Sequence, residues 1–199
     1  MYLLLTLFLA FVFAEICGYF VHILLHSNKI EFLSRSHMLH HLKDYGPKAG
    51  LRKPGVYLNS SRDRTSIFGI GLEWMIPIGM IAVLMWTVFI VFEIPYLYSL
   101  TFTAAALFWG YVLFGYIHAS LHLQDFWMEK SRFLGTWYKQ IRKLHDIHHL
   151  NISNSGQMLV NYGICFFFMD RIFGSLAPSH EKFNEAGYQE ALKRYSYIF

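Results

Sequence analysis

Three long apolar stretches constrain what this chain can fold into. They cover Tyr2–Leu25, residues 67–92 and residues 96–117, and Glu15 and Glu73 are their only acidic or basic side chains apart from histidine. A helix needs about 20 apolar residues to cross a bilayer core of about 30 Å. Charged residues make up only 15% of the chain, whereas about a quarter is usual in a soluble domain. The sequence therefore predicts an all-α, integral membrane helical bundle with about three membrane helices, in a single domain over residues 1–199.

A further apolar stretch lies within residues 156–173. Its run from 164 to 169 is short for a membrane crossing, and Asp170 and Arg171 follow it directly. We expect a helix or a re-entrant piece packed against the bundle, while a fourth crossing stays open.

The basic residues predict the orientation of the bundle. Most of them lie in two segments, 29–64 and 130–143, whereas the connection at 93–95 has neither lysine nor arginine. Three crossings place both basic segments on one side, which the positive-inside rule assigns to the cytoplasm. We expect the inner membrane of a bacterium or the endoplasmic reticulum of a eukaryote. This placement suits anionic lipid headgroups better than nucleic acid, which we do not expect as a partner despite the net charge of +4.

The histidines form four clusters with helical spacing. Residues three or four apart project from one face of a helix, so two imidazoles in such a cluster can converge on one cation. Imidazole is a good ligand for iron, zinc, copper or nickel. The clusters follow the order HxxxH, HxxHH, HxxxH, HxxHH, and the topology places all of them on one side of the membrane. Their members, the candidate metal ligands, are His22, His26, His37, His40, His41, His118, His122, His145, His148 and His149.

The number of histidines favours two metal ions. Ten rings exceed what one site can use, whereas two ions with about five imidazoles each would use them all and leave a position for water, oxygen or substrate. The alternative is a non-oxidative, histidine-rich metal-binding or transport protein, or a haem protein. Haem needs paired axial histidines on facing helices, and a transporter places its ligands near the bilayer midplane. We therefore expect a histidine-rich dimetal site at the cytoplasmic face.

The four clusters and the segment after them resemble the fatty acid hydroxylase superfamily, which includes sterol desaturases, lipid hydroxylases and carotenoid hydroxylases. The run Asn161-Tyr162-Gly163 and the later run from Asp170 to Ser175 are similar to the usual ending of that superfamily, with Met169 where its pattern has tryptophan. The resemblance implies two iron ions (zinc is possible in the isolated protein), O₂ as cosubstrate, and hydroxylation or desaturation of a lipid such as a fatty acyl chain, sterol or carotenoid.

Three further residues are candidates for supporting the catalytic centre. Asp146 and Asp170 could accept the second N–H of a ligating imidazole, and Asn161 could hydrogen-bond a metal-bound water. His180 stands outside the clusters and is expected at the surface. The chain shows no cytochrome b5-like or ferredoxin-like domain, so we expect a separate electron donor of either type, docked on the basic face.

Overall fold

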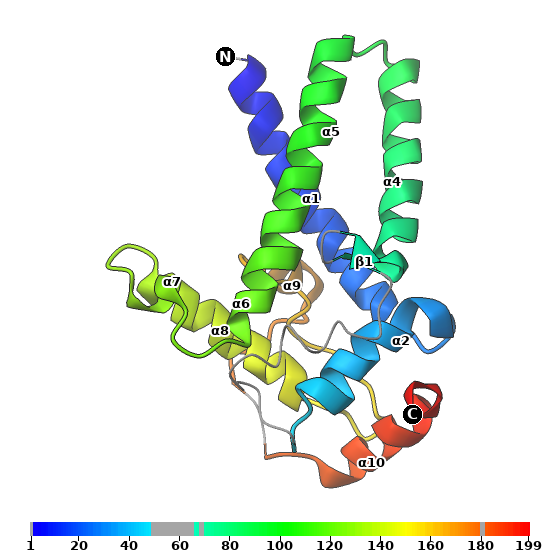
Figure 1. Cartoon of the computed structure of the whole chain (residues 1–199), viewed down its shortest axis with the longest axis vertical. Coiled ribbons are helices and arrows are strands. Elements are labelled where there is room, and N and C mark those ends of the chain that lie inside the picture. The colour runs from blue at the N-terminus through cyan, green and yellow to red at the C-terminus, as the bar shows by residue number, and fades with distance from the viewer. Residues whose placement is uncertain (1, 49–65, 68–69, 180–181) are drawn as a thin grey trace.

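The computed structural model describes residues 2–48, 66–67, 70–179 and 182–199. The protein is mostly helical, and three long apolar helices stand at one end of it (Figure 1). They are α1 (Tyr2–Leu25), α4 (Leu72–Val91) and α5 (Tyr96–Gly110), the last continued by the π-helix η2 (Tyr111–Ile117) and α6 (His118–Leu121). The prediction of a helical protein with three helices able to span a membrane is thus confirmed.

The second of these helices starts later than predicted. Two short antiparallel strands, β1 (Ser66–Ile67) and β2 (Ile70–Gly71), precede it and pair with each other. The expected start at residue 67 was therefore wrong, because apolar content alone does not distinguish a strand from a helix over a few residues.

The outer parts of the three long helices expose apolar side chains. In α1, Leu4 and Phe8 are more than half exposed, and Val83 and Ile90 of α4 are about 70% exposed. Such side chains would be unfavourable in water, and the bilayer is the environment that accommodates them. Towards its other end α1 becomes buried, because Gly18 brings it close to η2. A Cβ at Gly18 would lie 1.9 Å from the ring of Phe114.

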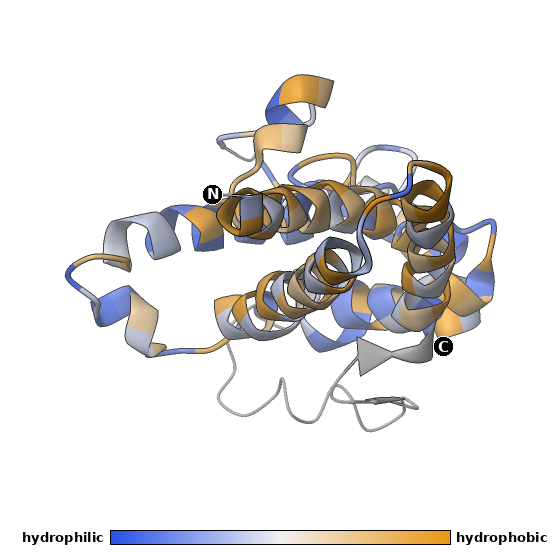
Figure 2. Ribbon diagram, turned by 90° about the horizontal axis from the view of Figure 1, so that it is seen from above, coloured by the Kyte–Doolittle hydropathy of each residue, from blue (hydrophilic) through white to orange (hydrophobic). Residues whose placement is uncertain are grey.

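The remaining elements form a layer across the other end of the long helices (Figure 1). Viewed from above, α7 and α8 at the left carry many hydrophilic residues (Figure 2). The layer consists of α2 (Glu31–Leu39), the π-helix η1 (His40–Asp44), α7 (Trp127–Lys130), α8 (Gly135–Leu150), α9 (Phe168–Phe173), α10 (Glu185–Arg194) and the 3₁₀ turn η3 (Ser196–Ile198).

The segment 156–173 contains no helix long enough to cross a membrane. Only α9 is helical in it, and six residues span about 9 Å at 1.5 Å per residue. The helix begins after Phe167, which has a left-handed backbone with φ of 53°, and it ends at Gly174 with φ of 71°. Most of the segment is irregular backbone, so the expectation of a helix holds only for its last turns. Met169, in the position of the superfamily's tryptophan, is buried against Tyr19 and Tyr162.

The C-terminal helix covers the second histidine cluster. Tyr188 and Tyr195 pack with Met38 and Leu42 in one hydrophobic cluster. The Tyr195 hydroxyl also donates a hydrogen bond of 2.7 Å to the backbone carbonyl of His26. This contact ties the turn after α1 to the end of the chain.

Candidate metal centre

The ten clustered histidines are all buried and converge in two groups of five. Within each group, one ring nitrogen from every histidine lies within 4.8 Å of the others. The first group comprises His22, His26, His37, His41 and His148; the second comprises His40, His118, His122, His145 and His149.

The distribution of the clusters follows from helical geometry. The HxxxH pair at the end of α1 belongs wholly to the first group, and the pair on α6 wholly to the second. Each HxxHH cluster is divided: its first and last histidines, four residues apart, join one group, while the middle histidine joins the other. The two halves of the chain therefore contribute in the same way, and each group takes one ring from the opposite half.

The spacing of the ring nitrogens fits metal coordination. The Nε2 atoms of His26 and His148, and those of His37 and His41, are 3.1 Å apart; those of His122 and His145 are 3.0 Å apart. Two nitrogens about 2.1 Å from a common ion, at right angles to each other, are separated by about 3 Å.

Several of the buried ring nitrogens have no hydrogen-bond partner in the described part of the chain. Among the described residues, Nε2 of His22 and of His40 and both ring nitrogens of His149 accept or donate no hydrogen bond. Buried polar atoms are normally hydrogen-bonded, so these atoms call for a ligand. The donor set is all nitrogen, which suits iron, zinc, copper or nickel, and the residues present therefore fit the metal ions that the sequence predicts.

Burial keeps these imidazoles in the neutral form that binds metals. Desolvation lowers the pKa of His41, His145 and His149 well below 6.5, and the neighbouring histidines lower it further. For His148, desolvation lowers the pKa to about 4, although its hydrogen bond to the Val160 carbonyl acts in the opposite direction. Metal binding therefore displaces few protons near neutral pH.

Two backbone carbonyls orient the first group. Nδ1 of His22 lies 2.6 Å from the carbonyl oxygen of Tyr162, and Nδ1 of His148 lies 2.6 Å from that of Val160. A carbonyl accepts, so in both rings Nδ1 carries the proton and Nε2 is left as the metal-binding atom. The irregular segment around residues 160–163 is thus the support of this group.

Asn161 anchors that segment. Its backbone has a φ of 55°, and its side-chain NH₂ donates to the carbonyls of Leu144 and Ala177 at 3.0 and 2.9 Å. Its Oδ1 accepts from the backbone N–H of Ala177 at 2.8 Å. Both N–H groups of the amide are therefore used within the protein, which leaves only the second lone pair of Oδ1 to accept from a metal-bound water, and that contact stays a prediction.

Asp170 anchors the same segment from the other side. Its carboxylate accepts from the backbone N–H groups of Tyr162 and Gly163 at 2.8 and 2.7 Å, and from the Ser175 hydroxyl at 2.7 Å. Burial raises the pKa of Asp170, while these three hydrogen bonds oppose the rise. The expected direct bond to an imidazole is replaced by an indirect one, in which Asp170 fixes the peptide whose carbonyl holds His22.

Asp146 lines a polar cleft with Gln124, Asp125, Lys139 and Lys143. The histidines at positions 145, 148 and 149 share one face of α8, whereas residue 146 is turned about 100° from residue 145. The support of a ligating imidazole by Asp146 stays a prediction. His180 lies outside the described residues.

Sequence reasoning missed two aromatic supports of the centre. The Tyr45 ring stacks on His122 with centroids 3.9 Å apart, and the Tyr195 hydroxyl holds the His26 carbonyl. Neither tyrosine belongs to a motif that signals its role. A third support, Arg142, bonds Glu129 at 2.6 Å and the Leu123 carbonyl at 2.9 Å, which fixes α8 against the chain after α6.

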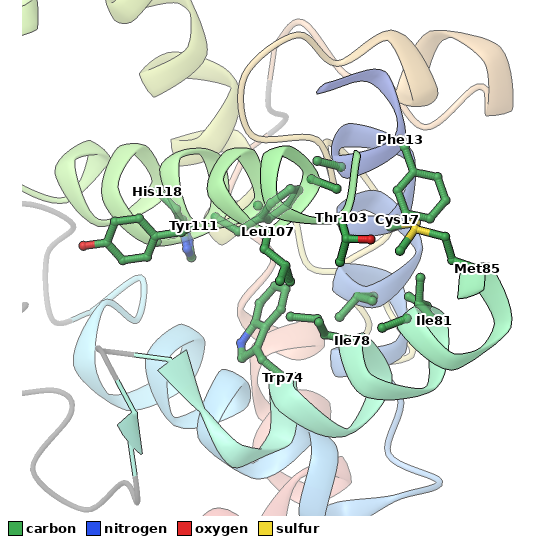
Figure 3. A pocket seen from close by; sticks show the side chains of 18 of the residues that line it. Phe13, Cys17, Trp74, Ile78, Ile81, Met85, Thr103, Leu107, Tyr111 and His118 are labelled. Carbon is green, nitrogen blue, oxygen red and sulfur yellow. The ribbon is translucent and has the colours of Figure 1, made fainter. Parts of the chain in front are cut away.

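An apolar cavity of about 170 Å³ lies between α1, α4 and α5 and ends at the histidines (Figure 3). Its lining includes His118 of the second group and, at the same end, His37 of the first and His40 of the second. Most of the other lining side chains are apolar, among them Phe13, Ile78, Met85 and Leu107. The cavity therefore connects both metal-binding groups to the membrane part of the protein.

Comparison with known proteins agrees with this geometry. A sequence model of the family described as "Fatty acid hydroxylase" matches residues 7–175, which include all ten of the converging histidines. Searches of the curated proteins and of the solved structures gave no match. The family is membrane-bound, typically iron-dependent and made up of oxidoreductases. The match covers far more than half of the chain, and the protein therefore belongs to the fatty acid hydroxylase family.

Proposed function

We propose that this protein is a membrane-bound, non-haem diiron oxidase that uses O₂ to hydroxylate or desaturate a C–H bond of a lipid. The observation that carries the proposal is the junction of two features: two groups of five buried imidazoles and an apolar cavity that ends at members of both groups. The family membership supports the same class of reaction.

The identity and arrangement of the ligands favour a catalytic centre over a structural one. Structural zinc sites are closed by four ligands, often with cysteine. Here five nitrogens surround each site, and the two cysteines of the chain do not belong to either group. Five ligands on an octahedral ion would leave one position, and the cavity lies where a substrate could approach it.

Bound iron would supply the reduction of O₂ and the oxidising power to remove hydrogen from an unactivated C–H bond. The side chains of this protein have other tasks. The histidines hold the ions, the carbonyls of Val160 and Tyr162 fix two of the rings, and the apolar cavity walls orient the lipid and exclude water.

The reaction needs electrons from outside the protein. We infer a separate donor, a cytochrome b5-like or ferredoxin-like protein, that approaches the layer of α7 and α8. Lys139 and Lys143 are exposed on this layer, and such charges accelerate the association of an acidic partner. By the positive-inside rule this layer, and hence the active site, faces the cytoplasm.

Metal loading followed by an oxidation assay tests the proposal. Protein purified from membranes and loaded anaerobically with Fe(II) should retain about two iron ions per chain and form an ¹⁸O-labelled alcohol or a new double bond when lipid, reductant and ¹⁸O₂ are added. The zinc-loaded protein is the matched control, because zinc is redox-inactive. Two retained ions without any oxygen-dependent product, over a broad panel of lipids, would instead indicate a metal-binding protein without oxidase activity.

A further inference from the structure

The two ends of the apolar cavity differ in chemistry. His118 lies at one end, with Tyr111 nearby, while Phe13, Cys17 and Met85 gather at the other (Figure 3). The ring of His40, which also lines the cavity, is 5.1 Å from that of His118. Thr103 also lines the far end, but its hydroxyl already donates to the Ser99 carbonyl of its own helix at 2.8 Å. The far end therefore offers an incoming molecule almost only apolar contacts, which suit the methyl end of an alkyl chain.

Aromatic side chains from all three long helices meet beyond this end. The ring of Phe13, on α1, contacts that of Phe102, on α5, with centroids 5.4 Å apart, and Phe102 contacts Phe89, on α4, at 5.6 Å. Phe13 lines the cavity itself, whereas the other two support it from behind. Edge-on aromatic pairs of this kind are mutually stabilising.

The distance from the histidines to this aromatic group defines a length. His118 and Thr103 lie on one continuous helix, fifteen residues apart, which corresponds to roughly 20 Å at about 1.5 Å per residue. An extended alkyl chain with C–C bonds of about 1.5 Å advances about 1.25 Å per carbon, so roughly sixteen carbons fit this length. The cavity volume, with room for roughly a dozen or more water-sized groups, is of the same order.

We propose that Phe13, supported by Phe102 and Phe89, closes the far end of the cavity and sets the length of the straight alkyl chain that the protein accepts. The chain enters methyl end first, so that the carbon presented to the histidines lies towards the polar end of the lipid. This inference rests on the proposed function for its substrate, but it concerns binding and can be measured without turnover.

Two substitutions should change the accepted length in opposite directions. Phe13→Ala removes a ring of roughly 4 Å and should lengthen the longest well-bound chain by about two to four carbons. Gly110→Leu should shorten it by several carbons, because Gly110 lines the cavity eight residues from His118 and a Cβ there meets nothing within 4 Å. Phe8→Ala is the matched control on α1, since Phe8 is 60% exposed and does not line the cavity.

The experiment measures the affinity of the zinc-loaded, full-length protein for straight-chain fatty acids of increasing length, at one fixed detergent concentration. The affinity should rise with length up to a break, and the break should move as stated in Phe13→Ala and Gly110→Leu but not in Phe8→Ala. An identical break in all four proteins, or affinity that rises without a break in the wild type, would overturn the inference.

The failure of this inference can be told apart from that of the proposed function. Breaks that move as expected, in a protein that forms no oxygen-dependent product after iron loading, would leave the chain-length role of Phe13 intact and reject the oxidase. If the protein forms oxidised products but their chain-length distribution is the same in Phe13→Ala, Gly110→Leu and the wild type, the oxidase function stands and the chain-length role of Phe13 is rejected.

Discussion

Replacing Asp170 by alanine should loosen the first group of histidines without touching any of them. The carboxylate accepts three hydrogen bonds, from the backbone N–H groups of Tyr162 and Gly163 and from the Ser175 hydroxyl, at 2.7–2.8 Å. Asp170 is completely buried, so the substitution leaves these donors without water. A buried hydrogen bond to a charged group contributes about 1.5–3 kcal/mol, and the three together about 3–6 kcal/mol after allowance for relaxation.

The consequence for the metal centre follows from the Tyr162 carbonyl, which holds His22. Once the peptide is released, the orientation of His22 is no longer fixed, and loss of such outer partners typically weakens metal affinity by about 10- to 100-fold. We expect Asp170→Ala to retain about one iron ion instead of two and to melt at a lower temperature. Asp170→Asn, which keeps the shape and one acceptor oxygen, should lie between this variant and the wild type.

Metal analysis after gel filtration, with thermal unfolding in the same detergent, measures both effects. Ser131→Ala is a suitable control, because this hydroxyl lies in the loop before α8 and accepts hydrogen bonds from the nearby backbone N–H groups of Phe133 and Leu134. Two tightly held ions and an unchanged melting temperature in Asp170→Ala would refute the reasoning.

Three other perturbations have defined outcomes. Acidification should destabilise the metal-free protein. In the folded protein the pKa values of His41, His145 and His149 are lowered. Below about pH 6.5 the unfolded protein therefore binds more protons than the folded protein, and the stability of the fold falls. Melting temperature should hence fall between pH 6.5 and 4, and a flat profile would contradict the buried neutral state. Alanine at His145, His148 or His149 should abolish activity and lower the amount of bound metal, whereas His180→Ala should change neither much. If all four variants keep the same metal content and product yield, the assignment of these histidines as metal ligands is wrong. Arg142→Ala should cost about 1–3 kcal/mol in an unfolding titration, because Glu129, the Leu123 carbonyl and the Tyr138 hydroxyl lose their donor; a loss below about 0.5 kcal/mol would show that this network does not hold α8.

The sequence was sufficient to predict the parts of the fold and of the site that follow from periodicity. Three apolar runs of membrane length became α1, α4 and the helix from Tyr96 to Leu121. The spacing of three and four residues predicted that histidines of one cluster converge, and the structure divides each HxxHH cluster between two groups as adjacent side chains on a helix require.

The parts that sequence reasoning missed depend on tertiary contacts. The acceptors for His22 and His148 are backbone carbonyls, which every residue has, so no side chain signals them. The sequence proposes a hydrogen bond from Asn161 to a metal-bound water but gives no sign that its amide also bonds the backbone carbonyls of Leu144 and Ala177. The role of Tyr45 depends on the fold of η1, which brings its ring onto His122.

X-ray absorption spectroscopy at the iron edge, combined with elemental analysis of the same sample, tests the central claim most directly. The claim predicts about two iron ions per chain, each with about five imidazole nitrogens at roughly 2.1 Å. A single ion per chain, or a first shell dominated by oxygen or sulfur, would contradict it.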